Sequence, residues 1–386
     1  MWTLTDQYAI AGIGYTDFSK NSERTVRRLA SEACLAAVRD AGLDISQVDG
    51  FCSFNMGDSV QGIAVATELG IPNLKWSVDL YAGGNAANLI VSNAAAAIHA
   101  GMATHVLCFR AMNGRSGYRF GGGGNAARAA GITQYTAPFG LMTYPQAMAM
   151  WCRRHMIDYG TTSEQLGTLA VTFRDNALRN PRAMMTTPLT LEDYLASRMI
   201  VDPFRMYDIC LESDGACAVL VTSADRARDL RPKPVYISSA VYGGGPNQGE
   251  DLFDLLRWPS HSHNCYKYLA ADLWGAAGIG PADLDFAQIY DCFTYSVLMA
   301  LEGLGFCREG EGGDWIQGGR IGHNGELPLN TAGGLLSEAY IHGFNHVIEA
   351  VQQLRGEAGE RQVPGAQIGL TTAGAMTCGS ALILRN

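Results

Sequence analysis

Hydrophobic positions along the chain fall into two recurring patterns: short unbroken apolar runs, and longer stretches with helical spacing. Tyr8–Gly14 is an unbroken run of the kind that forms a buried strand. Val26, Leu29 and Ala33 then recur on one helical face, and Gly42 stands where such a helix would end. Strands that alternate with helices predict an α/β fold, with a mainly parallel sheet covered by helices.

The stretch 80–109 carries no charged residue, which raises the question of a membrane span. Asn88, Ser92 and His99 interrupt its apolar residues. We therefore expect a buried helix followed by a buried strand, and no membrane-spanning segment. The N-terminal residues also lack the basic start and hydrophobic run of a secretory signal.

One sequence segment occurs twice. Ala41–Asp49 and Ala277–Asp285 both begin with Ala-Gly and end, after the same spacing, with an apolar residue and Asp. Similar apolar strands, Gly215–Val221 and Gly379–Leu384, close the two parts of the chain. The same features in the same order indicate a duplicated α/β unit, and the charged, proline-bearing segment Asp229–Pro234 marks the junction.

We therefore expect an N-terminal half, residues 1–230, and a C-terminal half, residues 231–386. The first half contains a polar, glycine-rich insertion at about 113–203, which we interpret as a lobe covering the site. Its run Gly121–Gly124 lacks the Gly-Lys-Ser/Thr ending of a phosphate-binding loop, so a flexible loop is favoured. Pro145–Tyr159, further along the insertion, has helical character.

The composition limits the classes of function. With 386 residues, 47% of them hydrophobic and 17% charged, the chain is long enough for two well-packed core units. A net charge of −9 argues against nucleic-acid binding. The ten cysteines are scattered singly, and no His, Asp or Glu cluster has metal-ligand spacing. This pattern favours reduced thiols in the cytoplasm and predicts no metal site.

Two polar-aromatic stretches are the candidates for a functional site. Asn330–Gly343 contains the pair Gly333 and Gly334, which allows a tight turn and a close approach of the backbone to a ligand. Gln288–Gly305 lies about fifty residues upstream and also combines aromatic and polar side chains with an apolar stretch. We expect the two stretches to share one site.

The duplicated halves and these two motifs resemble the thiolase superfamily, in its sterol-carrier-protein or lipid-transfer branch. The late segment at Asn330 reads Asn-x-x-Gly-Gly-Leu, and the second motif begins at Tyr290 as Tyr-Asp-Cys-Phe. The resemblance extends over essentially the whole chain. It implies a layered αβαβα fold built from two α/β halves, and a homodimer.

The chain departs from thiolases at each catalytic position. Tyr81 stands where the nucleophilic cysteine belongs, and Ala373 stands where the late acid/base cysteine belongs. Tyr340 replaces the histidine of Gly-His-Pro, and Tyr290 replaces the histidine of His-Asp-Cys-Phe. Claisen condensation through an acyl-cysteine therefore cannot run on this set.

Tyrosine at both histidine positions is similar to the steroid side-chain aldolases, thiolase-like proteins that cleave a β-hydroxyacyl-CoA by retro-aldol reaction. The resemblance implies a steroid-derived substrate that carries coenzyme A, and as products a ketone or aldehyde and a short acyl-CoA such as propionyl-CoA or acetyl-CoA. It also implies a small zinc-ribbon/OB-fold partner in a heterotetramer, with zinc only in that partner. We expect this chain to require no cofactor of its own.

The resemblance assigns acid/base and enolate-stabilising roles to Tyr290 and Tyr340, without deciding which does which. A tyrosine hydroxyl can donate to an enolate oxygen, and such donors are a large catalytic contribution. His342 could orient Tyr340, serve as base or be structural. Asp291 either supports the site or is a loop cap or a buried hydrogen-bond partner, and Asn330 is expected to support its loop.

Substrate contacts are expected from Tyr81, Gly333 and Gly334. Tyr81 would lie at a helix N-terminus and would either line the steroid pocket or fill the volume of the missing acyl-cysteine. For the phosphates of coenzyme A, the nearest basic side chains in the sequence, which solvated surface arginines would explain as well, are Arg115, Arg119, Arg153 and Arg154.

Two other functions remain open. An acyl-CoA acyltransferase or unusual thiolase would use Cys292, which has no evident activating partner in the sequence. A non-catalytic scaffold that binds CoA thioesters would tolerate replacement of both Tyr290 and Tyr340 by phenylalanine.

Overall fold

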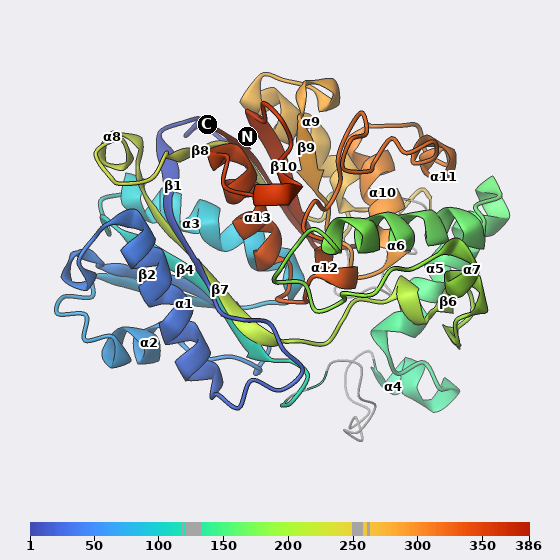
Figure 1. Ribbon diagram of the computed structural model, residues 1–386, viewed down its shortest axis with the longest axis horizontal. Coiled ribbons are helices and arrows are strands. Elements are labelled where there is room, and N and C mark those ends of the chain that lie inside the picture. The colour runs from blue at the N-terminus through green and yellow to red at the C-terminus, as the bar shows by residue number, and fades with distance from the viewer. Residues whose placement is uncertain (118, 120–132, 249–257, 261–262) are drawn as a thin grey trace.

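The computed structural model describes residues 1–117, 119, 133–248, 258–260 and 263–386 (Figure 1). Its centre is a nine-stranded sheet in the order β3-β2-β4-β7-β1-β8-β11-β10-β9, and β5 and β6 form a separate two-stranded sheet. The strands are β1 (Tyr8–Tyr15), β2 (Gly50–Asn55), β3 (Trp76–Tyr81), β4 (Val106–Asn113), β5 (Met199–Val201), β6 (Phe204–Arg205), β7 (Asp214–Ser223), β8 (Val235–Gly243), β9 (Phe286–Gln288), β10 (Ile368–Ala373) and β11 (Gly379–Arg385).

Helices connect the strands and cover the sheet. They are α1 (Val26–Ala41), α2 (Gly62–Glu68), α3 (Ala87–His99), α4 (Thr133–Thr136), α5 (Tyr144–Tyr159), α6 (Ser163–Ala177), α7 (Leu191–Ala196), α8 (Ala224–Ala227), α9 (Cys265–Ala277), α10 (Thr294–Leu304), α11 (Gly312–Trp315), α12 (Gly334–Ser337) and α13 (Phe344–Arg355). The helices of the described residues are too short or too polar to cross a lipid bilayer. The expected buried helix and strand within 80–109 are α3 and β4.

The sheet is mixed, so the prediction of a mainly parallel sheet is wrong. β7 runs antiparallel to both β1 and β4, and β11 runs antiparallel to both β8 and β10. Only β2 with β3, β2 with β4 and β9 with β10 are parallel pairs among the described strands. A strand buried on both faces reads as a continuous apolar run in either direction, so the sequence pattern could not reveal the sense of pairing.

The two expected halves contribute matching series of strands that meet at the centre. β1 and β8, the first strand of each series, pair antiparallel through Ala9 with Tyr236 and Ile10 with Val235. The last strand of each series, β7 or β11, lies next to the first one. The exact division at residue 230 stays a prediction.

Helices form the outer layers and the middle layer. α3 and α13 contact strands of both series and each other, and lie in the middle of the molecule in Figure 1. α1 covers β1, β4 and β7 on one outer side, while α9 packs on β8 and β11 on the other, with α10 against it. This arrangement is the expected layered αβαβα core.

The duplicated sequence segment folds in the same way twice. Gly42 and Gly278, both in the left-handed backbone region with φ of 74° and 69°, end the preceding helices α1 and α9. Asp49 then accepts the backbone N–H groups of residues 104 and 105, just before β4. Asp285 accepts those of residues 367 and 368 at the start of β10. Each aspartate therefore joins two neighbouring parallel strands at their beginnings.

The described helices of the insertion, α4 to α7, lie on the right in Figure 1, and the bounds of the lobe stay a prediction. Its helix α5 confirms the helical character of Pro145–Tyr159, and two further helices, α6 and α7, were not predicted from the sequence. α6 packs against α12 of the C-terminal half. The glycine run Gly121–Gly124 lies outside the described residues.

Candidate active site

The two predicted stretches meet at a pair of tyrosines. The hydroxyl oxygens of Tyr290 and Tyr340 lie 3.1 Å apart, within hydrogen-bond distance. Tyr290 follows β9, whereas Tyr340 lies between α12 and α13. Tyr290 is 5% exposed and Tyr340 is half-buried. Gln288–Gly305 and Asn330–Gly343 therefore come together in the structure, and their shared functional role stays a prediction.

Burial determines the protonation state of the pair. It raises the pKa of Tyr290 well above its ordinary value, and the neighbouring Tyr340 hydroxyl adds to this effect. Burial likewise raises the pKa of Tyr340, although the hydrogen bond from Tyr290 opposes it. Both hydroxyls are therefore protonated near neutral pH, and each combines a donor with acceptor lone pairs.

Two glycines allow the Tyr290 ring to lie where it does. A Cβ atom on Gly84, at the start of a short 3-10 turn before α3, would collide with the Tyr290 hydroxyl. A Cβ atom on Gly343 would lie 2.8 Å from the same ring, and Gly343 also has a φ of 82°. Thr372 Oγ1 on β10 accepts the Tyr290 backbone N–H at 2.8 Å. The backbone at Gly84 and Gly343 thus packs directly against the side chain of Tyr290.

Asp291 joins the two stretches. Its carboxylate accepts the backbone N–H groups of Leu335 at 2.8 Å and Leu336 at 3.2 Å, in the first turn of α12. Its Oδ1 also lies 3.1 Å from His346 Nε2 on α13. Asp291 is fully buried, so the structure gives it a bracing role next to Tyr290.

Asn330 supports the same junction, as predicted for it. Its Oδ1 accepts the Ile289 backbone N–H at 2.7 Å, and its Nδ2 donates to the Ile289 carbonyl oxygen at 2.9 Å. This pair of hydrogen bonds holds the residue that precedes Tyr290. The backbone of Asn330 has a φ of 45°, a left-handed conformation that asparagine tolerates.

Gly333 and Gly334 pack closely against other parts of the protein. A Cβ atom on Gly333 would lie 2.5 Å from the Cβ of Ala177 on α6, and Gly333 has a φ of 101°. A Cβ atom on Gly334 would collide with the Asp291 carboxylate. The tight turn is therefore needed to pack α12 against its neighbours, and the predicted substrate contact of the two glycines stays a prediction.

His342 contacts a buried arginine that the sequence analysis missed. Arg110 on β4 is 0% exposed, and its Nε and Nη2 lie 3.2 and 2.9 Å from His342 Nδ1. Asp58 forms an ion pair with the same guanidinium. The ring of His342 lies edge-on to Tyr340, with centroids 4.9 Å apart. An arginine within an apolar strand was the signal in the sequence that could have revealed this group.

The lobe braces the segment that leads to Tyr340. Arg174 on α6 donates from Nε to Ser337 Oγ at 3.0 Å. Asn180, just after α6, donates from Nδ2 to the Ala332 carbonyl oxygen at 2.9 Å. The lobe therefore supports the site from behind with buried polar side chains.

Tyr81 occupies a different environment from the one expected. It is the last residue of β3, its side chain is 82% exposed, and the turn before α3 begins only at Gly84. The placement at a helix N-terminus and the filling of a vacated volume are both wrong, because the exposed face of an edge strand carries the side chain. A role of Tyr81 in substrate binding stays a prediction.

Cys292 lies one residue before Phe293, the N-cap of α10. Burial nevertheless raises the pKa of the Cys292 thiol to about 12. The thiol is thus protonated near neutral pH and is a poor nucleophile.

The four arginines considered for coenzyme A do not form one cluster of unpaired charge. Arg119 pairs with Glu212, Arg153 with Asp202 and Arg154 with Asp158. In the described ranges, no three His, Cys, Asp or Glu side chains gather closely enough to hold a metal ion.

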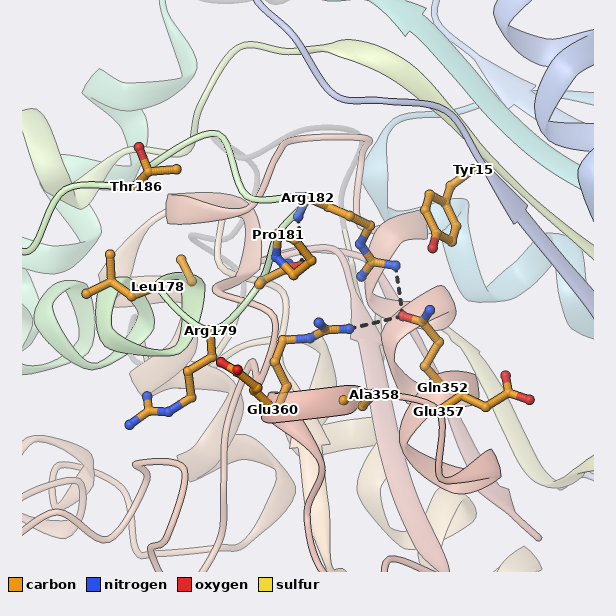
Figure 2. A pocket seen from close by; sticks show the side chains of 14 residues that line it. Tyr15, Leu178, Arg179, Pro181, Arg182, Thr186, Gln352, Glu357, Ala358 and Glu360 are labelled. Carbon is orange, nitrogen blue, oxygen red and sulfur yellow. Dashed lines mark hydrogen bonds between the residues drawn. The ribbon is translucent and has the colours of Figure 1, made fainter.

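A pocket of about 590 Å³ lies beside the buried polar residues that brace the segment before Tyr340. Neither Tyr290 nor Tyr340 lines it (Figure 2). Arg182, labelled in Figure 2, donates to Gln352 Oε1 at 2.8 Å, and Arg361 donates to the same oxygen at 3.3 Å. Arg182 also pairs with Glu338 and Glu349 at 2.9 and 3.3 Å. Because these charges are already neutralised, we interpret the pocket as part of the brace.

Comparison with known proteins adds a consistent result. The family described as "Thiolase C-terminal domain-like" matches residues 262–386. The chain is 43% identical over 387 residues to the 17-hydroxy-3-oxo-4-pregnene-20-carboxyl-CoA lyase of Mycobacterium tuberculosis, covering 99% of this chain and 100% of the relative. It is also 43% identical over 390 residues to the steroid side-chain-cleaving aldolase of Thermomonospora curvata, covering 100% of this chain and 99% of that one.

A solved structure agrees with these relatives. The structure described as "Ltp2-ChsH2(DUF35) aldolase" superposes with a TM-score of 0.92 at 42% sequence identity, covering 100% of this chain and 99% of that one. The fold and the sequence are thus both similar to those of thiolase-fold aldolases.

Proposed function

The chain belongs to the thiolase superfamily, in the group of the steroid side-chain-cleaving aldolases, and we propose that it cleaves a steroid β-hydroxyacyl-CoA by a retro-aldol reaction at the tyrosine pair. It is an aldolase, a carbon–carbon lyase, with a thiolase-like fold. The observation that carries the proposal for the site is the 3.1 Å approach of the Tyr290 and Tyr340 hydroxyls.

The reaction needs no redox partner and no covalent intermediate. In a 17-hydroxy-pregnene-20-carboxyl thioester, the hydroxyl group is β to the thioester carbonyl. Loss of the hydroxyl proton and cleavage of the bond between carbons 17 and 20 give a 17-ketone and a thioester enolate. Protonation of the enolate carbon gives propionyl-CoA, so the proton lost by the hydroxyl balances the one gained by carbon.

The two tyrosines can carry out both proton transfers together. Each hydroxyl can accept a proton through a lone pair while it donates its own, and both are protonated in the free protein. We propose that one hydroxyl takes the substrate proton as the other stabilises and then protonates the enolate. The relay leaves no net charge on the pair, which suits its buried setting.

Cleavage of a synthetic 17-hydroxy steroid thioester, with and without a candidate partner protein, tests the proposal. Equimolar 17-ketone and propionyl-CoA are expected, with no requirement for free coenzyme A. Acyl exchange with free coenzyme A and no ketone would contradict the proposal and favour an acyltransferase.

We also propose a small zinc-ribbon/OB-fold partner in a heterotetramer, with zinc held only by that partner. The name of the similar solved structure pairs its aldolase with a DUF35 protein. Six apolar side chains between residues 135 and 157 of the lobe are exposed, and exposed apolar side chains are a feature of protein-binding surfaces. They are Tyr135, Phe139, Met142, Tyr144, Met150 and Ile157.

The homodimer and the cytoplasm remain part of the proposal. β3 is an edge strand with exposed side chains at alternate positions, including Tyr81, and such an edge can pair with a second copy. The ten free cysteines fit a reducing compartment. Sedimentation of the chain, of Phe139→Asp and of Tyr81→Asp, each with and without partner, tests the two surfaces separately: Phe139→Asp should lose only the partner, and Tyr81→Asp only the dimer.

A further inference from the structure

Arg110 is a fully buried cation in the middle of an apolar strand, an arrangement that needs a reason. Removing a guanidinium from water is costly unless it is paired and hydrogen-bonded. Here Asp58 supplies the opposite charge, and Nη1 donates to the carbonyl oxygens of Phe54 and Ala111, both at 3.3 Å. The remaining donors of Arg110 are directed at the His342 ring, 2.9 Å away at Nη2.

The contact between Arg110 and His342 determines which nitrogen of the imidazole carries the proton. Both Nε and Nη2 of Arg110 lie within hydrogen-bond distance of Nδ1, at 3.2 and 2.9 Å. Arginine has donors only, so Nδ1 must accept through its lone pair. A neutral His342 therefore carries its proton on Nε2.

Burial and the neighbouring arginine keep the imidazole neutral. Arg110 faces His342 from β4 and Asp58 faces it only through that guanidinium, while Phe54 stacks on the ring from β2 at 6.1 Å between centroids. From the same loop, Tyr340 presents a protonated hydroxyl-bearing ring. Burial, followed by the charge of Arg110, lowers the pKa of His342 well below its ordinary value.

We propose that Arg110 is a positioning residue that fixes His342 as a neutral imidazole with its proton on Nε2, next to the tyrosine pair. His342 then cannot act as general base, because its only lone pair accepts from Arg110. The acid/base steps are left to Tyr290 and Tyr340. This consequence for catalysis rests on the proposed function, whereas the protonation state does not.

Nitrogen NMR of the full chain labelled with [15N]histidine tests the protonation state directly. Comparison with His342→Gln identifies the signals of His342 among the eight histidines. Between pH 5.5 and 8.5, on the order of one unit or more either side of an ordinary histidine pKa, we expect an unprotonated Nδ1, a protonated Nε2 and no titration. Titration near the ordinary value, or a proton on Nδ1, would overturn the inference.

A charge-free pair of substitutions tests the role of Arg110. In Arg110→Met/Asp58→Asn no unpaired carboxylate is left behind, and His342 should begin to titrate towards its ordinary pKa of about 6.5. The pH profile of kcat/KM should then fall on the acid side, unlike that of the wild type. Arg228→Met/Asp225→Asn, which removes an exposed pair, is the matched control.

The two possible failures are distinguishable. A wild type that shows the expected nitrogen signals but cleaves no steroid thioester would remove the proposed function and leave this inference intact. An active wild type whose His342 titrates would do the reverse. If the double variant does not fold, Arg110→Lys retains the charge next to Nδ1, so its His342 should stay neutral; titration there would also contradict the inference.

Discussion

The N-terminal and C-terminal halves share one frame and differ in what they bring to the site. The aspartates Asp49 and Asp285 make the same pair of backbone contacts at the starts of β4 and β10. Counting from these contacts, Phe54 corresponds to Tyr290. The first half therefore contributes a plain ring, and the second a ring with a hydroxyl.

The same correspondence pairs Arg110 on β4 with Ala373 on β10. The first half thus places a cation where the second places a methyl group, and the cation lies against His342 of the second half. The site therefore depends on different side chains at corresponding positions of two halves that share one frame. One half supplies the hydroxyls, and the other supplies charge and close-packed backbone.

The largest expected effect comes from removing either hydroxyl. Tyr290→Phe and Tyr340→Phe should each lower kcat/KM for the steroid thioester about 100-fold, the usual contribution of a positioned acid or base. Tyr295→Phe is the control, because Tyr295 is buried on the adjacent helix and, among the described residues, its hydroxyl has no hydrogen-bond partner. Equal activity in all three variants would favour the scaffold function.

A methyl group added at Gly84, where the first half packs against Tyr290 of the second, should have the next largest effect. Gly84→Ala places a methyl group against the Tyr290 hydroxyl and should displace it, so kcat falls while the thermal stability changes less. Gly280→Ala is the control, since its nearest atom would be Asp283 Oδ2 at 3.9 Å. Steady-state kinetics and thermal unfolding of both variants provide the measurement, and unchanged kcat in Gly84→Ala would contradict the observed packing.

The two frame aspartates should affect stability unequally. Asp49→Asn and Asp285→Asn each weaken two backbone hydrogen bonds, at a cost of roughly 1–3 kcal/mol. Asp49 should cost more, because it is buried at 7% exposure and also pairs with Lys75 at 3.0 Å, whereas Asp285 is half-buried.

The effect of Asp49→Asn should also depend on pH. Burial alone would raise the pKa of Asp49, but the backbone N–H groups of His105 and Thr104, together with Lys75, outweigh it and lower the pKa below its ordinary value. The stabilisation is therefore present above that value and lost as pH falls through the folded-state pKa. Chemical unfolding should show the wild type losing its advantage as the pH falls below the ordinary pKa of an aspartate. An advantage that does not change with pH would contradict this assignment.

The smallest effect is expected at Cys292. Cys292→Ala should leave cleavage within a few-fold of wild type, because the thiol is protonated and buried. Alkylation of the wild-type protein should likewise leave activity unchanged at this residue. Loss of activity in both experiments would favour the acyltransferase.

The sequence was sufficient for the layered fold and for the meeting of Tyr290 with Tyr340, since motifs and duplication carry that information. It was not sufficient for strand direction, because strands buried on both faces read alike either way. Arg110 was missed because its partners Asp58 and His342 are distant in sequence. Tyr81 was misplaced because the turn before α3 begins only at Gly84, so Tyr81 falls at the end of the edge strand β3, where its side chain is exposed.

The cross-braces on either side of the tyrosine pair have a further consequence. Asn330 holds Ile289, and Asp291 holds the first turn of α12, so both hydroxyl-bearing residues are fixed from behind by groups that a ligand need not touch. The spacing of the hydroxyls is therefore set when the chain folds. The protein therefore needs little rearrangement in each catalytic cycle, because its proton donors are in position before a substrate binds.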